Sequence, residues 1–222
     1  MNIDTLFFTI ISRGKANAVL SKAEECGAAG GTIFLGEGTV QSKLLERLGL
    51  IETPKEVLMI STSEELSDCL HDALSETFSK RNNGIAFTVP FRRHKLNVSE
   101  EEQENPEKEH IHLYDCIITI VDKGRSRDCI KAARTAGANG GTLVHGHGAG
   151  IPTDFYYPLL IEPQKDIVFN ISPRDKSNAI REEIISELEL EKTGNGIIFT
   201  LPIVRVSGLY EDRTKGRKGV TS

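Results

Sequence analysis

The feature that most constrains this chain is an internal duplication. Gly14–Gly38, GKANAVLSKAEECGAAGGTIFLGEG, aligns without a gap with Gly124–Gly148, GRSRDCIKAARTAGANGGTLVHGHG, at an offset of 110 residues. Further along, NNGIAFTVPF at Asn82–Phe91 aligns with GNGIIFTLPI at Gly194–Ile203 at an offset of 112. A repeat of this length indicates two copies of one folding unit, because each copy brings its own set of core positions.

The duplication divides the chain into four parts. Residues 1–95 form copy one and residues 113–210 form copy two. Residues 96–112, LNVSEEEQENPEKEHIH, are rich in Glu and nearly free of apolar side chains. Nothing in them can offset the entropy lost on ordering, so we expect an acidic linker rather than a recognition segment for a basic partner. Residues 211–222 are interpreted as a basic flexible tail.

Each copy shows the same pattern of predicted elements. An apolar, β-branched run at Leu6–Ser12 predicts a strand, and a helix should follow and end at Gly27, a typical C-terminal glycine. Strands at Gly31–Leu35 and Val57–Ser61, a second amphipathic helix and a final strand complete copy one. The order βαββαβ predicts an α+β protein of two ferredoxin-like domains, each an antiparallel sheet with helices on one face. The predicted helical core positions are Ala16, Val19, Leu20, Ala23, Cys26, Leu66, Leu70, Leu74 and Phe78 in copy one and Cys129, Ile130, Ala133, Ala136, Ile180, Ile184 and Leu188 in copy two.

Charge and composition narrow the class of protein. The 222 residues carry a net charge of −5, which disfavours a nucleic-acid partner. The N-terminus shows no signal-peptide pattern, and no apolar run approaches membrane-spanning length. The cysteines Cys26, Cys69, Cys116 and Cys129 form no CxxC pair, so we expect reduced, buried thiols and a cytoplasmic location.

The residue strings resemble a known family. GAxGGTxxxGxG after the first helix and NGIxFTxP near the end of each copy resemble the nitrogen-regulatory PII signalling proteins, and the resemblance covers nearly all of each copy. It implies a tandem signal-transduction regulator in which domains assemble into rings, so a homo-oligomer is expected and a trimer is favoured. It further implies a small-molecule effector between domains and a regulated target protein, such as a membrane transporter or an enzyme of nitrogen metabolism.

The resemblance also implies where a ligand binds. In the family, the first strand, the GxG segment and the turn before the last strand surround a nucleotide. Glycine in such places permits positive φ and lets backbone N–H groups converge on a phosphate, although the same glycines would also suit plain tight turns. The implied ligand-binding residues are Ile10, Gly36, Glu37, Gly38, Asn83 and Gly84 in copy one and Ile120, Gly146, His147, Gly148, Gly194, Asn195 and Gly196 in copy two.

This chain departs from the family at the phosphate contacts. The family places a lysine directly after the second turn glycine, where this chain has Ile85 and Ile197. Of the family's paired arginines, copy two has Arg205, and copy one has Arg92 and Arg93 in imperfect register. Without these cations a triphosphate would be poorly compensated. We therefore expect no tightly bound cofactor, an effector such as ADP or AMP in preference to ATP, and leave open that the nucleotide site is lost.

The loop of copy two suggests a surface for the partner. Phe155, Tyr156 and Tyr157 stand between two prolines in AGIPTDFYYPLL. Aromatic side chains gathered on a loop are typical of binding hot spots. Packing of the three rings back onto the protein is the alternative.

Metal binding and catalysis are less favoured. His145 and His147 point to one side of an extended segment but supply only two ligands, and copy one has Leu35 and Glu37 at these positions. A duplicated metal-responsive or structural module that binds no nucleotide is the alternative function. The sequence contains no nucleophile elbow and no P-loop, so we expect no enzyme.

Overall fold

The computed structural model describes residues 3–39, 52–79, 83–91, 112–147 and 164–209. Both copies have the predicted βαββαβ order, and the α+β prediction is confirmed. Copy one contains β1 (Thr5–Ser12), α1 (Ala16–Glu25), β2 (Thr32–Thr39), β3 (Glu52–Thr62), α3 (Glu64–Ala73), α4 (Ser75–Ser79) and β4 (Gly84–Pro90). Copy two contains β5 (Tyr114–Asp122), α5 (Ser126–Thr135), β6 (Thr142–His147), β7 (Gln164–Pro173), α6 (Arg174–Leu188), β8 (Ile197–Ile203) and the short β9 (Arg205–Ser207).

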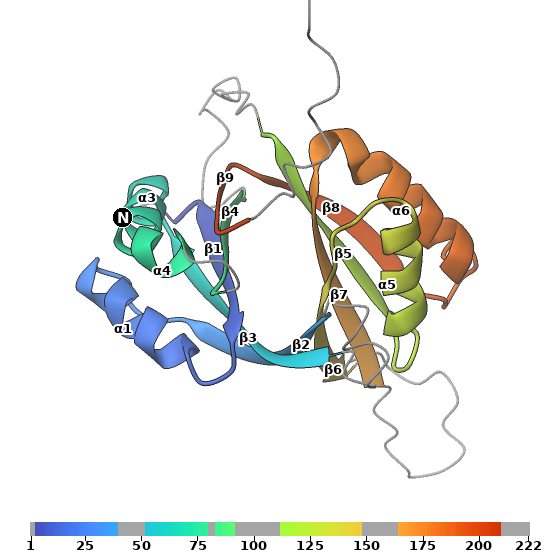
Figure 1. Ribbon diagram of the computed structural model, residues 1–222, viewed down its shortest axis with the longest axis horizontal. Helices are drawn as coiled ribbons and strands as arrows, with labels where there is room; N and C mark the ends of the chain where they lie inside the picture. The colour runs from blue at the N-terminus through green and yellow to red at the C-terminus, as the bar shows by residue number, and fades with distance from the viewer. Residues whose placement is uncertain (1–2, 40–51, 80–82, 92–111, 148–163, 210–222) are drawn as a thin grey trace, which may run out of the picture.

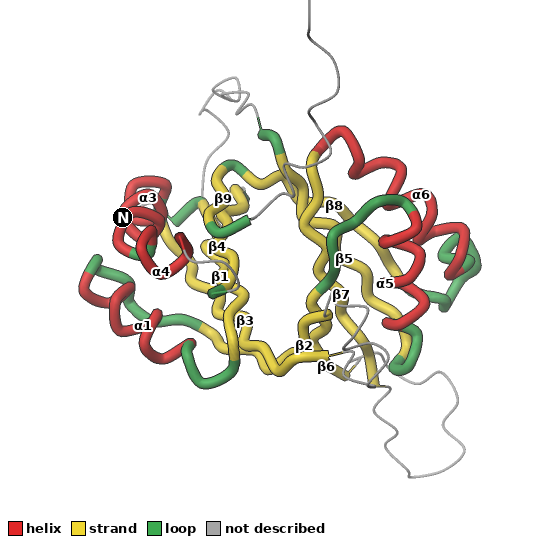
Figure 2. The backbone as a smooth tube through the Cα atoms, viewed as in Figure 1, coloured by secondary structure: helices red, strands yellow, loops and turns green. Residues whose placement is uncertain are grey.

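The two copies share one sheet, which the sequence did not predict. Nine strands pair in the order β8-β5-β7-β6-β2-β3-β1-β4-β9, and every pairing is antiparallel. β2 of copy one pairs with β6 of copy two, and β9 leaves copy two to pair with β4 of copy one. The sheet therefore curves into a ring, with α1, α3 and α4 outside one half and α5 and α6 outside the other (Figures 1 and 2).

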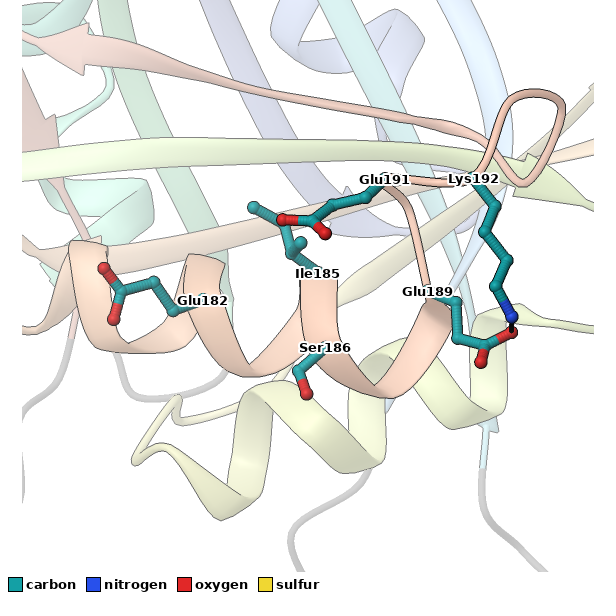
Figure 3. Close-up of a pocket in the computed structure, with 6 residues that line it drawn as sticks. All are labelled: Glu182, Ile185, Ser186, Glu189, Glu191 and Lys192. Carbon is teal, nitrogen blue, oxygen red and sulfur yellow. Dashed lines mark ion pairs between the residues drawn. The ribbon is translucent and has the colours of Figure 1, made fainter.

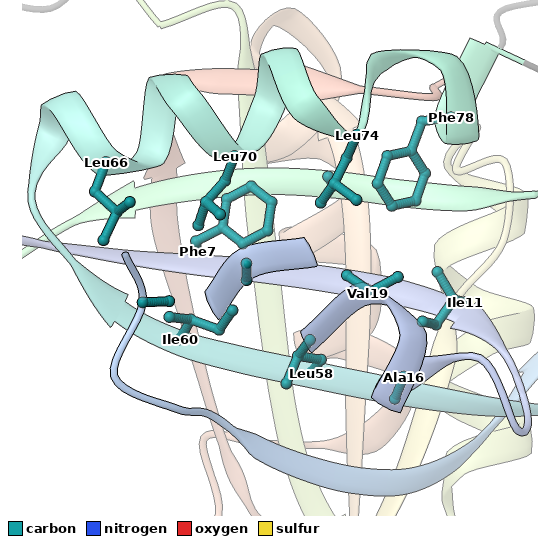
Figure 4. Close-up of a cluster of buried hydrophobic side chains, with 13 residues drawn as sticks. Phe7, Ile11, Ala16, Val19, Leu58, Ile60, Leu66, Leu70, Leu74 and Phe78 are labelled. Carbon is teal, nitrogen blue, oxygen red and sulfur yellow. The ribbon is translucent and has the colours of Figure 1, made fainter. Parts of the chain in front are cut away.

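Each half has an outer core between its sheet and its helices. In copy one the helices pack on Phe7, Leu58 and Ile60 of the sheet (Figure 4). The predicted helix faces are buried as expected, except that Leu20, Cys26 and Ala136 are only partly buried. Gly27 and Gly137 end α1 and α5 with φ of 102° and 97°, which confirms the predicted C-terminal glycines.

An inner core fills the ring. The strand residues that point away from the helices come together from both copies, so the sheet is covered on both faces. Burial of this second face couples the copies, because neither copy alone could remove its inner side chains from water. The buried residues of this inner core are Phe8, Ile10, Val57, Phe87, Val89, Cys116, Ile118, Val144, Ile171 and Ile203.

Some expectations about elements and thiols were wrong. β2 runs on to Thr39 and β3 starts at Glu52, because all of β2 pairs with the first eight residues of β3. Cys116 and Cys129 are buried as predicted, but Cys26 is partly exposed and Cys69 is exposed on the solvent side of α3. None of the helices in the described residues is long and apolar enough to cross a membrane.

Candidate ligand site

A small hollow lies where β6 ends beside the start of β7 in copy two. It has a volume of about 220 Å³. His145–His147 pair there with Gln164–Asp166 of β7, and Lys123 follows β5 directly. The hollow is lined by Lys123, His145, Gly146, His147, Gln164 and Lys165. It thus brings together Gly146 and His147, which are predicted to bind ligand, and the second histidine of the HGH segment, His145.

A buried carboxylate holds one of these histidines. Asp166 accepts a hydrogen bond from the Gly124 N–H at 2.9 Å and another from His145 Nδ1 at 3.0 Å. Burial by itself would raise the pKa of Asp166, but the hydrogen bonds from Ser126, Gly124 and His145 outweigh burial and lower it. With Nδ1 committed to Asp166, Nε2 is the His145 ring atom left for a ligand.

The two lysines of the hollow differ in their charge balance. Lys165 Nζ forms an ion pair with Asp122 Oδ1 at 2.5 Å, which offsets its charge. Lys123 Nζ donates to the neutral amide oxygen of Gln164, also at 2.5 Å. Lys123 therefore contributes a positive charge that this hydrogen bond does not cancel, and the hollow suits an anion.

Copy one keeps the scaffold of this site but not its two histidines. At the offset of 110, Glu56 replaces Asp166, and its carboxylate accepts the Ala16 N–H at 2.8 Å at the start of α1. Burial would raise the pKa of Glu56, whereas backbone N–H groups of Gly14, Ala16 and Lys15 lower it. The carboxylate thus anchors the first helix in both copies, and the imidazoles belong to copy two alone. The copy-one residues that replace the lining are Arg13, Leu35, Gly36, Glu37, Pro54 and Lys55.

The GxG residues predicted to bind ligand in copy one lie within paired strands. Gly36, Glu37 and Gly38 belong to β2 and pair with β3 on one side and β6 on the other. A Cβ on Gly36 would lie 2.4 Å from the Leu143 carbonyl oxygen, so glycine there permits contact between the copies. Gly148, next to the hollow in sequence, lies outside the described residues.

The turns before β4 and β8 contact both the preceding helix and the neighbouring strand. The side-chain amide of Asn83 donates to Thr77 O at 3.0 Å, and that of Asn195 donates to Glu189 O at 2.9 Å, so each secures the end of the preceding helix. A Cβ on Gly84 or Gly196 would lie 2.5 Å from the carbonyl oxygen of Ile10 or Ile120, and both glycines have positive φ. Gly194 also has positive φ, as its place in this turn requires. None of these residues lines the hollow.

The remaining predicted residues fall elsewhere. Ile10 is buried in the inner core, and Ile120 packs against it. Phe155, Tyr156 and Tyr157 lie outside the described residues, so their role as a partner surface stays a prediction. Arg205 binds Asp68 and Asp72 of α3 rather than lining the hollow.

His145 and His147 by themselves supply only two ligands for a metal ion. Within the described residues, no group of three or more His, Cys, Asp or Glu side chains could hold a metal ion. His145 is instead oriented by Asp166.

A second, larger hollow borders the end of α6. It has a volume of about 470 Å³ and is lined by Glu182, Ile185, Ser186, Glu189, Glu191 and Lys192. Figure 3 shows Lys192 reaching back to Glu189, with an Nζ–Oε2 distance of 2.7 Å. This surface is open and rich in Glu, and it contains no predicted site residue. We therefore place the candidate ligand site at the smaller hollow.

Sequence reasoning missed three residues of the site. Lys123 carries the positive charge, Gln164 accepts its hydrogen bond and Asp166 orients the His145 ring, yet no family motif pointed to them. One sequence feature did point to Asp166, because the duplication aligns it with another acidic residue, Glu56. A carboxylate kept in both copies indicates a shared structural task.

The comparisons with known proteins found similar solved structures but no matching family model or curated protein. A PII protein of Arabidopsis thaliana bound to citrate is 20% identical over 41% of this chain and 75% of its own, with a TM-score of 0.33. A B. subtilis GlnK–ATP complex is 13% identical over 40% and 79% of the two chains, with a TM-score of 0.31. A microcompartment protein from Desulfitobacterium hafniense is 11% identical over 91% and 96%, with a TM-score of 0.29. At such TM-scores, none of these similarities decides what this chain binds.

Proposed function

We propose that this chain is a PII-like signal-transduction regulator that binds a small anionic effector in the hollow of copy two. The observation that carries the proposal is the convergence of Lys123, His145 and His147 around the glycine backbone at Gly146. Cationic side chains and backbone N–H groups are the usual donors for phosphates and carboxylates. The proposal is of a binding protein, not an enzyme.

The size of the hollow limits the effector. Pockets that enclose a drug-sized ligand measure roughly 300–1,000 Å³, so a hollow of about 220 Å³ would hold only part of an adenine nucleotide. We propose that it holds a phosphate group of ADP, AMP or ATP, or a small carboxylate in its place.

The regulated target would contact the segment that follows His147. Binding can control that contact only if the effector has different affinities for two states of the protein. In the proposal, the target binds at Phe155, Tyr156 and Tyr157, and a membrane transporter or nitrogen-metabolism enzyme is the kind of target that the family resemblance favours.

Calorimetry tests the proposal. The protein is titrated with ATP, ADP, AMP, citrate and inorganic phosphate, and at least one is expected to bind. Lys123→Gln should weaken binding by about tenfold or more, because a charge-assisted hydrogen bond is lost. Arg13→Gln, the matched change in copy one, should leave affinity unchanged. Absence of binding by all five ligands, or equal losses in both variants, would refute the proposed site.

A further inference from the structure

Copy one carries two neighbouring cysteines on its outer helical layer. Cys26 directly follows α1, and Cys69 lies within α3. The Cys26 thiol donates a hydrogen bond to the Cys69 carbonyl oxygen at 4.0 Å, which places the two cysteines side by side. Both cysteines are free, with Cys69 exposed and Cys26 partly exposed. Neither thiol lines the proposed ligand site.

We propose that Cys26 and Cys69 form a reversible disulfide that fastens the end of α1 to α3. The oxidant is a small-molecule disulfide such as oxidised glutathione. Cys69 thiolate attacks one oxidant sulfur and expels the other as a thiolate, which leaves a mixed disulfide. Cys26 then loses its proton to solvent, attacks the Cys69 sulfur and expels the second thiolate. Two protein thiols are oxidised to one disulfide, and the oxidant is reduced to two thiols.

The local environment sets the order of these steps. A hydrogen bond with Cys69 and, after it, burial raise the pKa of Cys26 to about 11. Because the thiolate is the attacking species, Cys26 is a poor first nucleophile near neutral pH. Cys69 is the exposed sulfur that an oxidant reaches, and Cys26 is placed to resolve the mixed disulfide. The reaction should accelerate as pH rises.

The other two cysteines provide an internal contrast. Cys116 and Cys129 are buried in the inner core and in the outer core of copy two. Burial raises the pKa of Cys116 to about 12 and that of Cys129 to about 11. Neither should react while the protein is folded.

Copy two indicates which replacements the fold accepts. The offset of 110 that aligns Leu70 with Ile180 places Ala136 and Ala179 at the positions of Cys26 and Cys69. Cys26→Ala and Cys69→Ala therefore restore the residues of the sister copy, and both variants are expected to fold.

Oxidation of the full-length protein tests the proposal. After incubation with oxidised glutathione at mildly alkaline pH, non-reducing peptide mass spectrometry should find the Cys26 peptide joined to the Cys69 peptide, with the loss of two hydrogen atoms. Because the bond closes a loop between residues 43 apart, the oxidised protein should melt roughly 5 °C or more above the reduced protein, and dithiothreitol should reverse the shift.

The variants separate this pair from other thiols. Cys69→Ala should yield neither the crosslink nor the melting shift, and Cys26→Ala should stop at a glutathione adduct on Cys69. The proposal is overturned if the wild type also stops at that adduct, or if oxidation joins two chains instead of the two cysteines of one chain.

Discussion

At the scale of single residues, a buried histidine connects the two copies. His71 of α3 shares hydrogen bonds through Nε2 with Thr88 Oγ1 at 3.0 Å and through Nδ1 with Ser207 Oγ of β9 at 2.8 Å. Burial and, secondarily, the nearby Arg205 lower the pKa of His71 to about 4, although Asp68 and Asp72 act in the opposite direction. A neutral imidazole is therefore part of the junction between α3, β4 and β9.

This histidine should make stability depend on pH. The pKa of His71 is lower in the folded protein than in the unfolded chain, so its contribution to stability is complete above about pH 6.5 and is lost as pH falls toward about 4. The loss amounts to about 3 kcal/mol. Urea unfolding across this range should show a smaller pH slope for His71→Gln than for the wild type. An unchanged slope in His71→Gln would contradict this assignment.

The two GxG segments should respond differently to the same change. A Cβ on Gly36 would lie 2.4 Å from Leu143 O, whereas on Gly146 its nearest neighbour is Ile167 Cδ1 at 3.6 Å, an ordinary contact. Gly36→Ala should therefore cost about 2 kcal/mol or more, and Gly146→Ala less than about 1 kcal/mol. Urea midpoints measure both, and equal losses would argue against the pairing of β2 with β6.

This contrast shows that aligning the two copies does not predict the neighbours of each glycine. Alignment equates Gly36 with Gly146 and suggests one role for both. The structure gives them different neighbours, because Gly36 meets the backbone of copy two, more than 100 residues further along the chain. For the same reason Lys123 and Gln164 could not be linked to His145 before the strands were placed in register.

At the scale of elements, β9 closes the ring by a short pairing and an ion-pair cluster. Arg205 begins β9 and reaches across to α3, where its guanidinium contacts Asp68 at 2.5 Å and Asp72 at 2.6 Å. Val204 N–H adds a hydrogen bond to Thr88 O at 3.0 Å. A strand of three residues depends on such contacts, because its ladder is short.

The ion pairs of β9 should have a measurable, salt-dependent effect. Arg205→Ala is expected to lower the free energy of unfolding by about 1 kcal/mol, because the pairs are partly exposed. Arg205→Lys should recover only part of this, since an ammonium cannot span both carboxylates as a guanidinium does. Denaturant titration in low and high salt measures the effect, and a loss that does not shrink in high salt would contradict an electrostatic origin.

The apolar periodicity predicted the helices and strands better than it predicted their first and last residues. The helices of both copies followed from apolar spacing, and Gly27 and Gly137 end the first helix of each as expected. The extension of β2 to Thr39 depends on its pairing with β3 and β6, and β9 depends on β4, so neither has a local signal.

At the scale of the whole molecule, the shared sheet should make the copies fold as one unit. The inner core draws on both copies, and the pairings of β2 with β6 and of β4 with β9 join them at two places. Calorimetry of the full chain should show a single unfolding transition. Residues 1–95 and 113–210 produced separately should unfold at lower temperature and regain stability when mixed. Two independent transitions would show that the copies are separate domains.

Assembly beyond one chain is a separate question. The family resemblance predicts a trimer, whereas both junctions of the sheet are formed within a single chain. Light scattering in solution measures the state directly. A trimer would agree with the family resemblance, and a monomer would restrict ligand binding to sites within one chain.

We propose that copy two, and not copy one, holds the effector. Amide and histidine-ring NMR spectra recorded during titration with ADP or citrate test it residue by residue. We expect shifts at His145, Gly146, His147 and the Lys123 amide, with little change at the amides of Arg13 and Lys55, the copy-one counterparts of two lining residues. Shifts of equal size in both copies, or shifts confined to the α6 end around Glu189, would contradict it.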